Sequence, residues 1–492
     1  MWQGQYTKLF IGGSWMDPAT ADTLVVVSPY TEQIVAEVPA ASRADVDHAV
    51  AAARVACDQG PWPQMSVTGR MDVVRRLGEE YARNRETLAG LVTDEMGCPI
   101  GMSRSYQASI PKILIDTFLE LARQYPFSEV RRSALGNALV TREPVGVVAA
   151  VVPWNAPQVV TMIKLVPALL AGCTVVLKPA PETPLDSYLL AEMLQAAGLP
   201  DGVVSIVPAG REVSEYLVTH PGIDKVTFTG STGTGRRIAS LCGENLRRVT
   251  LELGGKSAAV ILDDADLDAT VESLRVGSLR NNGQVCSLKT RILVSRSREP
   301  ALLDRLTSMV TSMPVGDPAD PDTQVGPLVT ARQRERVEGY INIGTSQGAK
   351  VVTGGGRPKD LDRGWFVEPT IFSGVEPSMR IAQEEIFGPV LAVMAYDDED
   401  DAMRIANDSQ YGLNGSVFTS DLEHGLAVAR RMRTGTVELN GSPAGFTAPM
   451  GGFKCSGIGR EAGPEGFDAY VEMKSIGLPA AFATTLSGAG GQ

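Results

Sequence analysis

The stretch Val147-Val148-Ala149-Ala150-Val151-Val152 opens the part of the chain that decides the fold. It is an apolar run of strand length, and an apolar segment of helix length follows it at residues 159–170. Four further strand-like runs come next, with helical segments between them, at residues 174–177, 203–207, 225–229 and 248–252. Strands rich in β-branched residues that alternate with helices indicate a parallel sheet covered on both faces. Five such strands predict a Rossmann-like nucleotide-binding domain.

The rest of the chain extends this α/β pattern in both directions. Short strands in residues 1–40 precede a helical region from Ser42 to about Tyr125, and residues 128–146 are expected to form a hairpin with its turn at Gly136-Asn137. A second α/β region begins near Lys256. Its strand candidates are residues 258–261, 291–294, 390–393 and 415–418.

The composition is that of an ordinary globular protein without charge-driven partners. The chain has 492 residues, 43% of them hydrophobic, and a net charge of −12, which argues against binding to nucleic acids or to anionic membrane surfaces. No run of about twenty apolar residues predicts a membrane span, and the N-terminus does not have the pattern of a secretory signal. The six cysteines have no metal-ligand spacing and the three histidines join no cluster, so we expect no metal and a reducing, cytoplasmic environment.

Two groups with complementary chemistry lie about thirty residues apart in the chain. Cys286 follows Asn281-Asn282-Gly283-Gln284, a polar sequence that suits a turn better than a core, and Glu252 lies within Leu251-Glu252-Leu253-Gly254-Gly255-Lys256. A cysteine nucleophile needs a base to remove its proton, and a buried glutamate with a raised pKa can be that base or can activate water. A single cysteine is more often a buried apolar residue, so the pair depends on the motifs around it.

Polar and glycine-rich motifs stand at the ends of the predicted strands, where parallel sheets bind their ligands. Residues 229–236 are rich in glycine and hydroxyl groups and open a helix, which favours a phosphate site. Asn155 follows the first strand and can either donate a hydrogen bond to an oxyanion or cap the next helix. Lys178 follows the second strand, and Glu385, in Glu384-Glu385-Ile386-Phe387-Gly388-Pro389, can accept hydrogen bonds from a ribose.

In this combination the chain resembles the aldehyde dehydrogenase superfamily, in its NAD(P)-dependent, hydrolytic form. The resemblance spans essentially the whole chain, and the motifs that carry it occur in the family's order. They are Pro153-Trp154-Asn155, Lys178-Pro179, Phe228-Thr229-Gly230-Ser231, Leu251-Glu252-Leu253-Gly254-Gly255-Lys256, Gly283-Gln284-Val285-Cys286, Glu384-Glu385-Ile386-Phe387-Gly388-Pro389 and Gly457-Ile458-Gly459-Arg460-Glu461.

The resemblance implies roles for individual residues. Cys286 would be the nucleophile and Glu252 the general base. Asn155, with the backbone N–H of Cys286, would bind the oxyanion, and Glu461 would lie behind the base as part of a proton relay. NAD would be the cofactor, with NADP as the alternative, and no metal is implied. The residues in contact with the cofactor would be Trp154, Lys178, Gly230, Ser231, Gly235, Leu253, Glu385 and Phe387.

The resemblance also implies three structural parts and a tail. Residues 1–127 and 147–255 would form the Rossmann-like NAD(P)-binding domain, and residues 256–469 the α/β catalytic domain that bears the nucleophile. The hairpin at 128–146 and a strand at 470–480 would form a small β element for oligomerisation. Because an open sheet edge invites pairing with another chain, this element predicts a homodimer or homotetramer. Residues 481–492, rich in Ala, Ser, Thr and Gly, are expected to be a flexible tail.

Two departures from the family pattern affect the choice of cofactor and substrate. Many relatives that prefer NAD carry a carboxylate three residues after the lysine, where this chain has Pro181 with Glu182 beside it. Relatives specialised for small aldehydes line the substrate tunnel with aromatic residues, whereas this chain has aliphatic residues there. A wide, aliphatic tunnel is therefore expected, and it predicts a medium-to-large hydrophobic aldehyde as the substrate. Arg280 keeps open a semialdehyde with a distal carboxylate. The residues expected to line the tunnel are Ala156, Val159, Val160, Ile163 and Met450.

Three other functions are alternatives to this one. A CoA-acylating relative would lack the glutamate base, which this chain has at Glu252. A cysteine protease needs a histidine partner, and no histidine lies in a comparable glycine-rich motif. A catalytically silent binding protein of the same fold predicts a broken set of catalytic residues, whereas Asn155, Glu252 and Cys286 are all intact.

Overall fold

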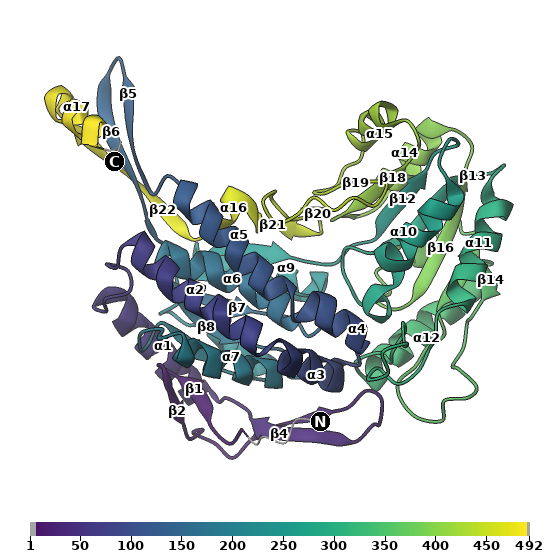
Figure 1. Ribbon diagram of the computed structural model, residues 1–492, viewed down its shortest axis with the longest axis horizontal. Coiled ribbons are helices and arrows are strands. Elements are labelled where there is room, and N and C mark those ends of the chain that lie inside the picture. The colour runs from purple at the N-terminus through teal and green to yellow at the C-terminus, as the bar shows by residue number, and fades with distance from the viewer. Residues whose placement is uncertain (1–5, 490–492) are drawn as a thin grey trace.

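The computed structural model describes residues 6–489, which form two α/β parts and a projecting arm (Figure 1). The first part contains the N-terminal half of the chain and lies on the left of the view, and the second lies on the right. The arm rises at the upper left, where strands from the first half of the chain meet its C-terminal segment. None of the helices in residues 6–489 is long and apolar enough to cross a membrane. The predicted α/β class is confirmed.

Five parallel strands form the centre of the first sheet, as the sequence predicts. Their order is β9 (Val204–Ile206), β8 (Thr174–Lys178), β7 (Val147–Val151), β10 (Lys225–Thr229) and β11 (Arg248–Glu252). The chain changes direction across the sheet between β7 and β10, and open α/β sheets bind their ligands at the carboxyl ends of the strands at such a point. Antiparallel strands complete both edges, namely β1 (Leu9–Ile11) and β2 (Ser14–Met16) beyond β9, and β21 (Gly457–Ile458) beyond β11.

Alternate residues of these strands face two different layers of helices. Val148 and Ala150 belong to one apolar core, whereas Val147 and Ala149 belong to the core on the opposite face, as the period of two in a strand requires. The first core is covered by α2 (Val67–Arg83), α3 (Arg85–Met96), α5 (Ile110–Gln124), α6 (Pro157–Ala171) and α7 (Leu185–Ala196). The second is covered by α1 (Arg43–Asp58), α8 (Arg211–Thr219) and α9 (Thr232–Glu244).

The second sheet contains the four strands expected in the second α/β region, and they are neighbours in it. The order is β14 (Lys350–Thr353), β15 (Thr370–Ser373), β16 (Val390–Tyr396), β13 (Lys289–Ser295), β12 (Ser257–Ile261), β18 (Gly415–Phe418) and β19 (Glu438–Leu439). All the pairings are parallel except that of β14 with β15. The covering helices are α10 (Leu267–Leu279) and α11 (Glu299–Thr311) on one face, and α12 (Ala331–Ser346), α14 (Glu399–Asn407) and α15 (Leu422–Ala429) on the other.

The arm is a three-stranded antiparallel sheet in the order β22 (Val471–Leu478), β6 (Gly136–Pro144) and β5 (Ser128–Ser133). The hairpin and its C-terminal partner strand are where the sequence predicts them, but the predicted turn is wrong. Gly136 pairs with Ser133 and Asn137 with Arg132, so the turn lies two residues earlier. Ser133 stabilises that turn, because its hydroxyl accepts from the backbone N–H of Leu135 and donates to the carbonyl of Gly136.

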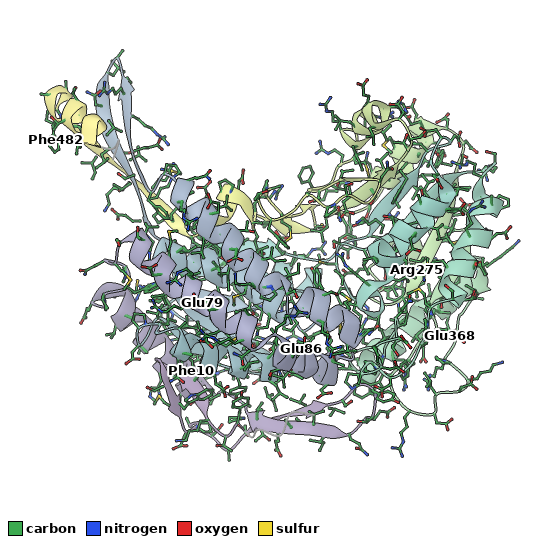
Figure 2. All side chains as sticks on the ribbon, in the orientation of Figure 1. Phe10, Glu79, Glu86, Arg275, Glu368 and Phe482 are labelled. Carbon is green, nitrogen blue, oxygen red and sulfur yellow. The ribbon has the colours of Figure 1, made fainter. Side chains whose placement is uncertain are left out.

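The C-terminal segment differs from the expected flexible tail. Residues Ala480–Ala489 form a helix, α17, which lies against β5 and β6, and residues 490–492 lie outside the described residues. Alanine is the strongest helix former, and the alanines in this segment outweigh its Ser, Thr and Gly content. Figure 2 shows Phe482 of this helix on the arm, far from Phe10 in the first sheet.

Candidate active site

The loop that precedes Cys286 has an unusual backbone conformation. Asn281, Asn282 and Gly283 have φ values of 52°, 59° and 76°, three left-handed residues in succession. Asparagine and glycine are the residues that adopt this conformation most readily. A side chain on Gly283 would also collide with the backbone of Gly388. The residue types in this loop are therefore set by the turn that delivers Cys286.

The loop is a turn, as its polar sequence predicts, but it lies inside the protein and its amide side chains are buried. Asn281, Asn282 and Gln284 are 1%, 0% and 0% exposed. The Nδ2 of Asn282 donates to the carbonyls of Gly97 and Pro327 at 3.0 and 2.8 Å, and the Oε1 of Gln284 accepts from the N–H of Val329 at 3.1 Å. Hydrogen bonds to backbone groups offset the cost of burying these amides. They fix the loop to the segments on both sides of it.

Asn155 is held beside this loop, at the carboxyl end of β7. Its Nδ2 donates to the carbonyl of Gln284 at 2.9 Å, and its own carbonyl accepts from the side chains of Gln107 and Asn281 at 3.0 and 2.9 Å. It does not cap the next helix, whose N-cap residue is Ala156. The capping alternative for Asn155 is therefore wrong.

Gln107 is a site residue that the sequence did not point to. It ends a short π-helix, η1 (Ser103–Gln107), between α3 and α5. Single turns of π-helix occur frequently at functional sites, because the extra residue re-aims the side chains around it. Here the turn directs Gln107 toward Asn155 and places Tyr106 5.4 Å beneath the guanidinium of Arg280.

The electrostatic surroundings of Cys286 keep its thiol protonated in the resting site. Burial raises the pKa of Cys286 to about 12, and the carboxyl groups of Glu385 and Glu252 add to this effect, while Arg280 opposes it. These three groups are therefore close enough to the sulfur to act on its charge. A base must take the proton before Cys286 can react.

Glu252 ends β11 and faces a second buried carboxyl group. Burial raises its pKa well above the ordinary value, and Glu461 raises it further, while Lys164 and Arg460 lower it. Glu461 accepts hydrogen bonds from the ammonium of Lys164 and, at 3.3 Å, from the hydroxyl of Thr227. Pairing of β21 with β11 brings the segment before Glu461 to this place.

The glycine-rich turn after β10 has the form of a phosphate site, but its glycines have different roles. Ser231 caps α9, since its hydroxyl accepts from the N–H of Thr234 at 3.3 Å. A Cβ on Gly230 would collide with the ring of Phe228, and one on Gly235 with the side chain of Leu253. Both glycines are thus explained by packing, whereas Gly233 has nothing within 4 Å and faces open space. An anion at this helix N-terminus would meet free N–H groups.

The remaining predicted cofactor residues surround the carboxyl ends of β8 and β11. Lys178 ends β8, and burial lowers the pKa of its ammonium group to about 8, against the effect of Glu182. Glu385 accepts from the N–H of Gly255 at 3.1 Å, and burial raises its pKa to about 7. The rings of Trp154 and Phe387 meet edge to face at 5.4 Å. These groups fit a dinucleotide, with a helix N-terminus for its phosphates and a carboxyl group for a ribose.

Residues expected to line the substrate path divide into two sets. Val159 and Ile163 are 5% and 2% exposed and belong to the core, whereas Val160 and Met450 are half-buried. Arg280 adds a polar group: its Nη2 donates to the hydroxyl of Ser287 at 3.3 Å, and its Nε is buried without a hydrogen-bond partner among the described residues.

Comparison with known proteins gives matches along nearly the whole chain. The model of the aldehyde dehydrogenase family matches residues 15–476. Geranial dehydrogenase of Castellaniella defragrans is 46% identical over 96% of this chain and 99% of its own. The 3-succinoylsemialdehyde-pyridine dehydrogenase of a Pseudomonas species is 41% identical over 96% of this chain and 98% of its own.

Two solved structures have the same fold over the same extent. An aldehyde dehydrogenase of Mycobacterium tuberculosis in complex with NAD+ superposes with a TM-score of 0.95 at 47% identity, covering 96% of this chain and 98% of its own. A mutant of aldehyde dehydrogenase C of Pseudomonas syringae, in complex with NAD+ and octanal, superposes with a TM-score of 0.93 at 40% identity, covering 96% of each chain.

Proposed function

The chain belongs to the aldehyde dehydrogenase family, and from this premise we propose that it oxidises an aldehyde to the carboxylic acid through a covalent intermediate on Cys286. One observation carries the proposal. Asn155 is hydrogen-bonded to the backbone of the loop that delivers Cys286, and Glu252 is near enough to act on the thiol. A nucleophile, an oxyanion donor and a base are thus gathered in one buried site.

The first half of the reaction forms and oxidises a thiohemiacetal. The thiol of Cys286 gives up its proton to water, and its sulfur bonds to the carbonyl carbon while the carbonyl oxygen becomes an oxyanion. The Nδ2 of Asn155 and the backbone N–H of Cys286 stabilise that oxyanion. NAD+, when bound, supplies the oxidising power by accepting the hydride from this carbon. Collapse of the oxyanion leaves a thioester on Cys286.

The second half hydrolyses the thioester. Glu252 takes a proton from water, the water oxygen bonds to the acyl carbon, and the bond to sulfur breaks, which releases the acid. Burial and Glu461 raise the pKa of Glu252, so this carboxyl group is a stronger base than an exposed glutamate. The Glu461–Lys164 pair behind it is positioned to relay the proton. A CoA-acylating enzyme would have no use for this base.

NAD is the cofactor of this enzyme, and NADP is the weaker alternative. Helix α9 would hold the phosphates, Lys178 the adenosine ribose, Glu385 the nicotinamide ribose, and Phe387, with Trp154 and Leu253, the nicotinamide end. Glu182 takes the place of the carboxylate missing at Pro181, since it acts on the charge of Lys178. The carboxylate of Glu182 would repel the 2′-phosphate of NADP.

The preferred substrate is a medium-to-large hydrophobic aldehyde. Val160 and Met450 offer aliphatic surface, whereas Ala156 is buried in the core like Val159, and each substrate CH₂ group buried against such a wall contributes about 0.8 kcal/mol. Two relatives support this choice, because one is named for geranial and another was solved with octanal. Acetaldehyde lacks the surface to gain this energy.

A carboxylate-bearing semialdehyde is a second candidate because of Arg280. Its guanidinium lies over the ring of Tyr106 and acts on the charge of Cys286, so it borders the reacting atoms. With Nε unpaired within residues 6–489, it has donor capacity for an anionic or carbonyl group. A relative named for a semialdehyde substrate agrees with this candidate.

An aldehyde panel separates the two candidates. We expect kcat/KM to rise from acetaldehyde to octanal and terpenoid aldehydes, and Arg280→Met to leave that order unchanged. If succinic semialdehyde is the best substrate and Arg280→Met abolishes that preference, the second candidate holds. A maximum at acetaldehyde contradicts both. Cys286→Ala serves as the blank, since it removes the nucleophile.

The larger organisation is also part of the proposal. Residues 1–127 and 147–255 serve as the cofactor-binding domain, residues 256–469 as the catalytic domain, and the arm as an oligomerisation element. The enzyme acts as a homodimer or homotetramer in the cytoplasm. The open edge of the arm strand supports the oligomer, and the unpaired cysteines support the cytoplasmic location.

A further inference from the structure

A row of polar side chains crosses one apolar face of the first sheet behind Glu252. Its members are Lys225, Thr227 and Thr250. Thr250 and Glu252 point to the same face, because they are two residues apart on β11. Lys225 and Thr227 of β10 lie on that face too, since Thr227 pairs with Thr250 in register. Lys225 is 2% exposed, and the mechanism above gives it no role.

Contacts of Lys225 link this row to the pair behind the base. Its Nζ donates to the hydroxyl of Thr250 at 2.7 Å and lies 5.3 Å from the centre of the Tyr470 ring. Thr227, between Lys225 and the carboxyl end of β10, donates to Glu461. Lys225 is therefore held between the strand that carries Glu252 and the segment that leads into the arm.

We propose that Lys225 is a positioning residue for hydrolysis of the thioester: held by Thr250 and Tyr470 on the row that leads through Thr227 to Glu461, it adds a positive charge to those of Lys164 and Arg460 and so helps Glu252 to release its proton. The inference rests on the proposed role of Glu252 as the base. Two carboxyl groups lie side by side here, and the ammonium of Lys164 is engaged by Glu461. Beside Lys164 and Arg460, a further cation on the Glu461 side offsets the second negative charge that appears when Glu252 ionises.

The charged groups around this row are consistent with that role. Glu461 and Cys173 raise the pKa of Lys225 while Lys164 and Arg248 lower it, and Cys242 and Tyr470 are further titratable neighbours. Burial is the largest effect and lowers the pKa of Lys225 to about 8, so the side chain is charged near neutral pH. Glu252 itself is faced by Glu461, Lys164 and Arg460, so Lys225 acts on it through Glu461.

The test is the pH dependence of steady-state NADH formation, measured with the burst of the first turnover. Lys225→Met should move the acidic limb of the steady-state rate about one pH unit upward and leave the burst amplitude unchanged, because only the hydrolytic step needs ionised Glu252. Lys225→Arg keeps the charge and should restore the limb. Lys350→Met, on the exposed edge strand β14, controls for the loss of one positive charge.

Each outcome decides the proposal. An unshifted limb in Lys225→Met, or an equal shift in Lys225→Arg, overturns it. If Lys225→Met does not fold, Thr250→Val removes the hydrogen bond that favours the charged lysine and should give a smaller shift in the same direction; no shift there overturns it as well. Undiminished hydrolysis in Glu252→Gln would instead reject the base itself, which separates this inference from the proposed function.

Discussion

The pKa values of Cys286 and Glu252 are both raised, for the same reason. Each group is surrounded by low-dielectric protein and lies near a carboxyl group, and both effects disfavour a negative charge. These effects favour the protonated forms of the nucleophile and of the base. Activity requires that one proton leave the pair, so we expect the rate to rise with pH.

Alkylation of Cys286 by iodoacetamide should show this directly. With a pKa of about 12, the thiolate fraction is about one in ten thousand at pH 8 and grows about tenfold per pH unit. Labelling of the Cys286 peptide, followed by mass spectrometry without cofactor, should therefore increase steadily from pH 7 to pH 10. Partly exposed Cys455 in the same digest is the internal reference. A plateau for Cys286 near pH 8 would contradict this electrostatic description.

The residues that we propose to react could be picked out from the sequence, but the residues that hold them in place could not. Cys286, Glu252 and Asn155 stand in recognisable motifs. Gln107 does not, because its role arises from a π-helical turn that no periodicity predicts. The burial of Asn281 and its neighbours could not be predicted either, because the backbone groups that accept hydrogen bonds from their amides belong to distant parts of the chain.

At the level of elements, two glycines in the turn from β10 into α9 have different roles, one in packing and one in the proposed cofactor site. Gly235 allows α9 to approach Leu253, whereas Gly233 faces open space. Gly235→Ala should therefore destabilise the fold by about 1–3 kcal/mol through overpacking, measured as a lower Tm. Gly233→Ala should keep the Tm of the parent and raise KM for NAD, because its methyl group meets only the cofactor.

This pair of variants separates folding from binding at one helix end. An unchanged KM for NAD in Gly233→Ala would show that the cofactor phosphates do not approach this turn. Equal Tm values for the two variants would contradict the close packing of Gly235 against Leu253.

Strands β7, β8 and β12, which are buried along their whole length, were predictable from their apolar runs, but the edge strand β14 was not. β14 is exposed, and it lacks that pattern. The turn of the arm was misplaced because Gly136-Asn137 is a common turn sequence, whereas here the hydroxyl of Ser133 fixes the turn two residues earlier.

Across the whole molecule, the arm has an open strand edge and exposed apolar residues. Within residues 6–489, β22 pairs only with β6, and Met473 and Ile476 are 66% and 43% exposed. We expect sedimentation to give a dimer or tetramer of the 52.3 kDa chain at micromolar concentration. Ile476→Lys should weaken the assembly, and Val55→Lys, at an exposed apolar residue of α1, should not. A stable monomer would contradict the proposed role of the arm.

The two α/β parts are joined by more than the active site. The carboxyl group of Glu32, in the N-terminal region, accepts from the N–H of Gly364, and the carbonyl of Pro29 accepts from the N–H of Trp365. Such contacts between distant segments cannot be predicted from local pattern, although the fold class and the order of the motifs can. They hold the cofactor residues and Cys286 in one framework.

The central claim, that Cys286 forms the covalent intermediate and Glu252 hydrolyses it, is tested most directly by intact-mass and peptide analysis of Glu252→Gln. After mixing with NAD and octanal, this variant should produce about one NADH per subunit and then stop, with the octanoyl group attached to Cys286. The parent enzyme should turn over without accumulating the adduct. Continued turnover of Glu252→Gln, or an acyl group on any residue other than Cys286, would contradict the account.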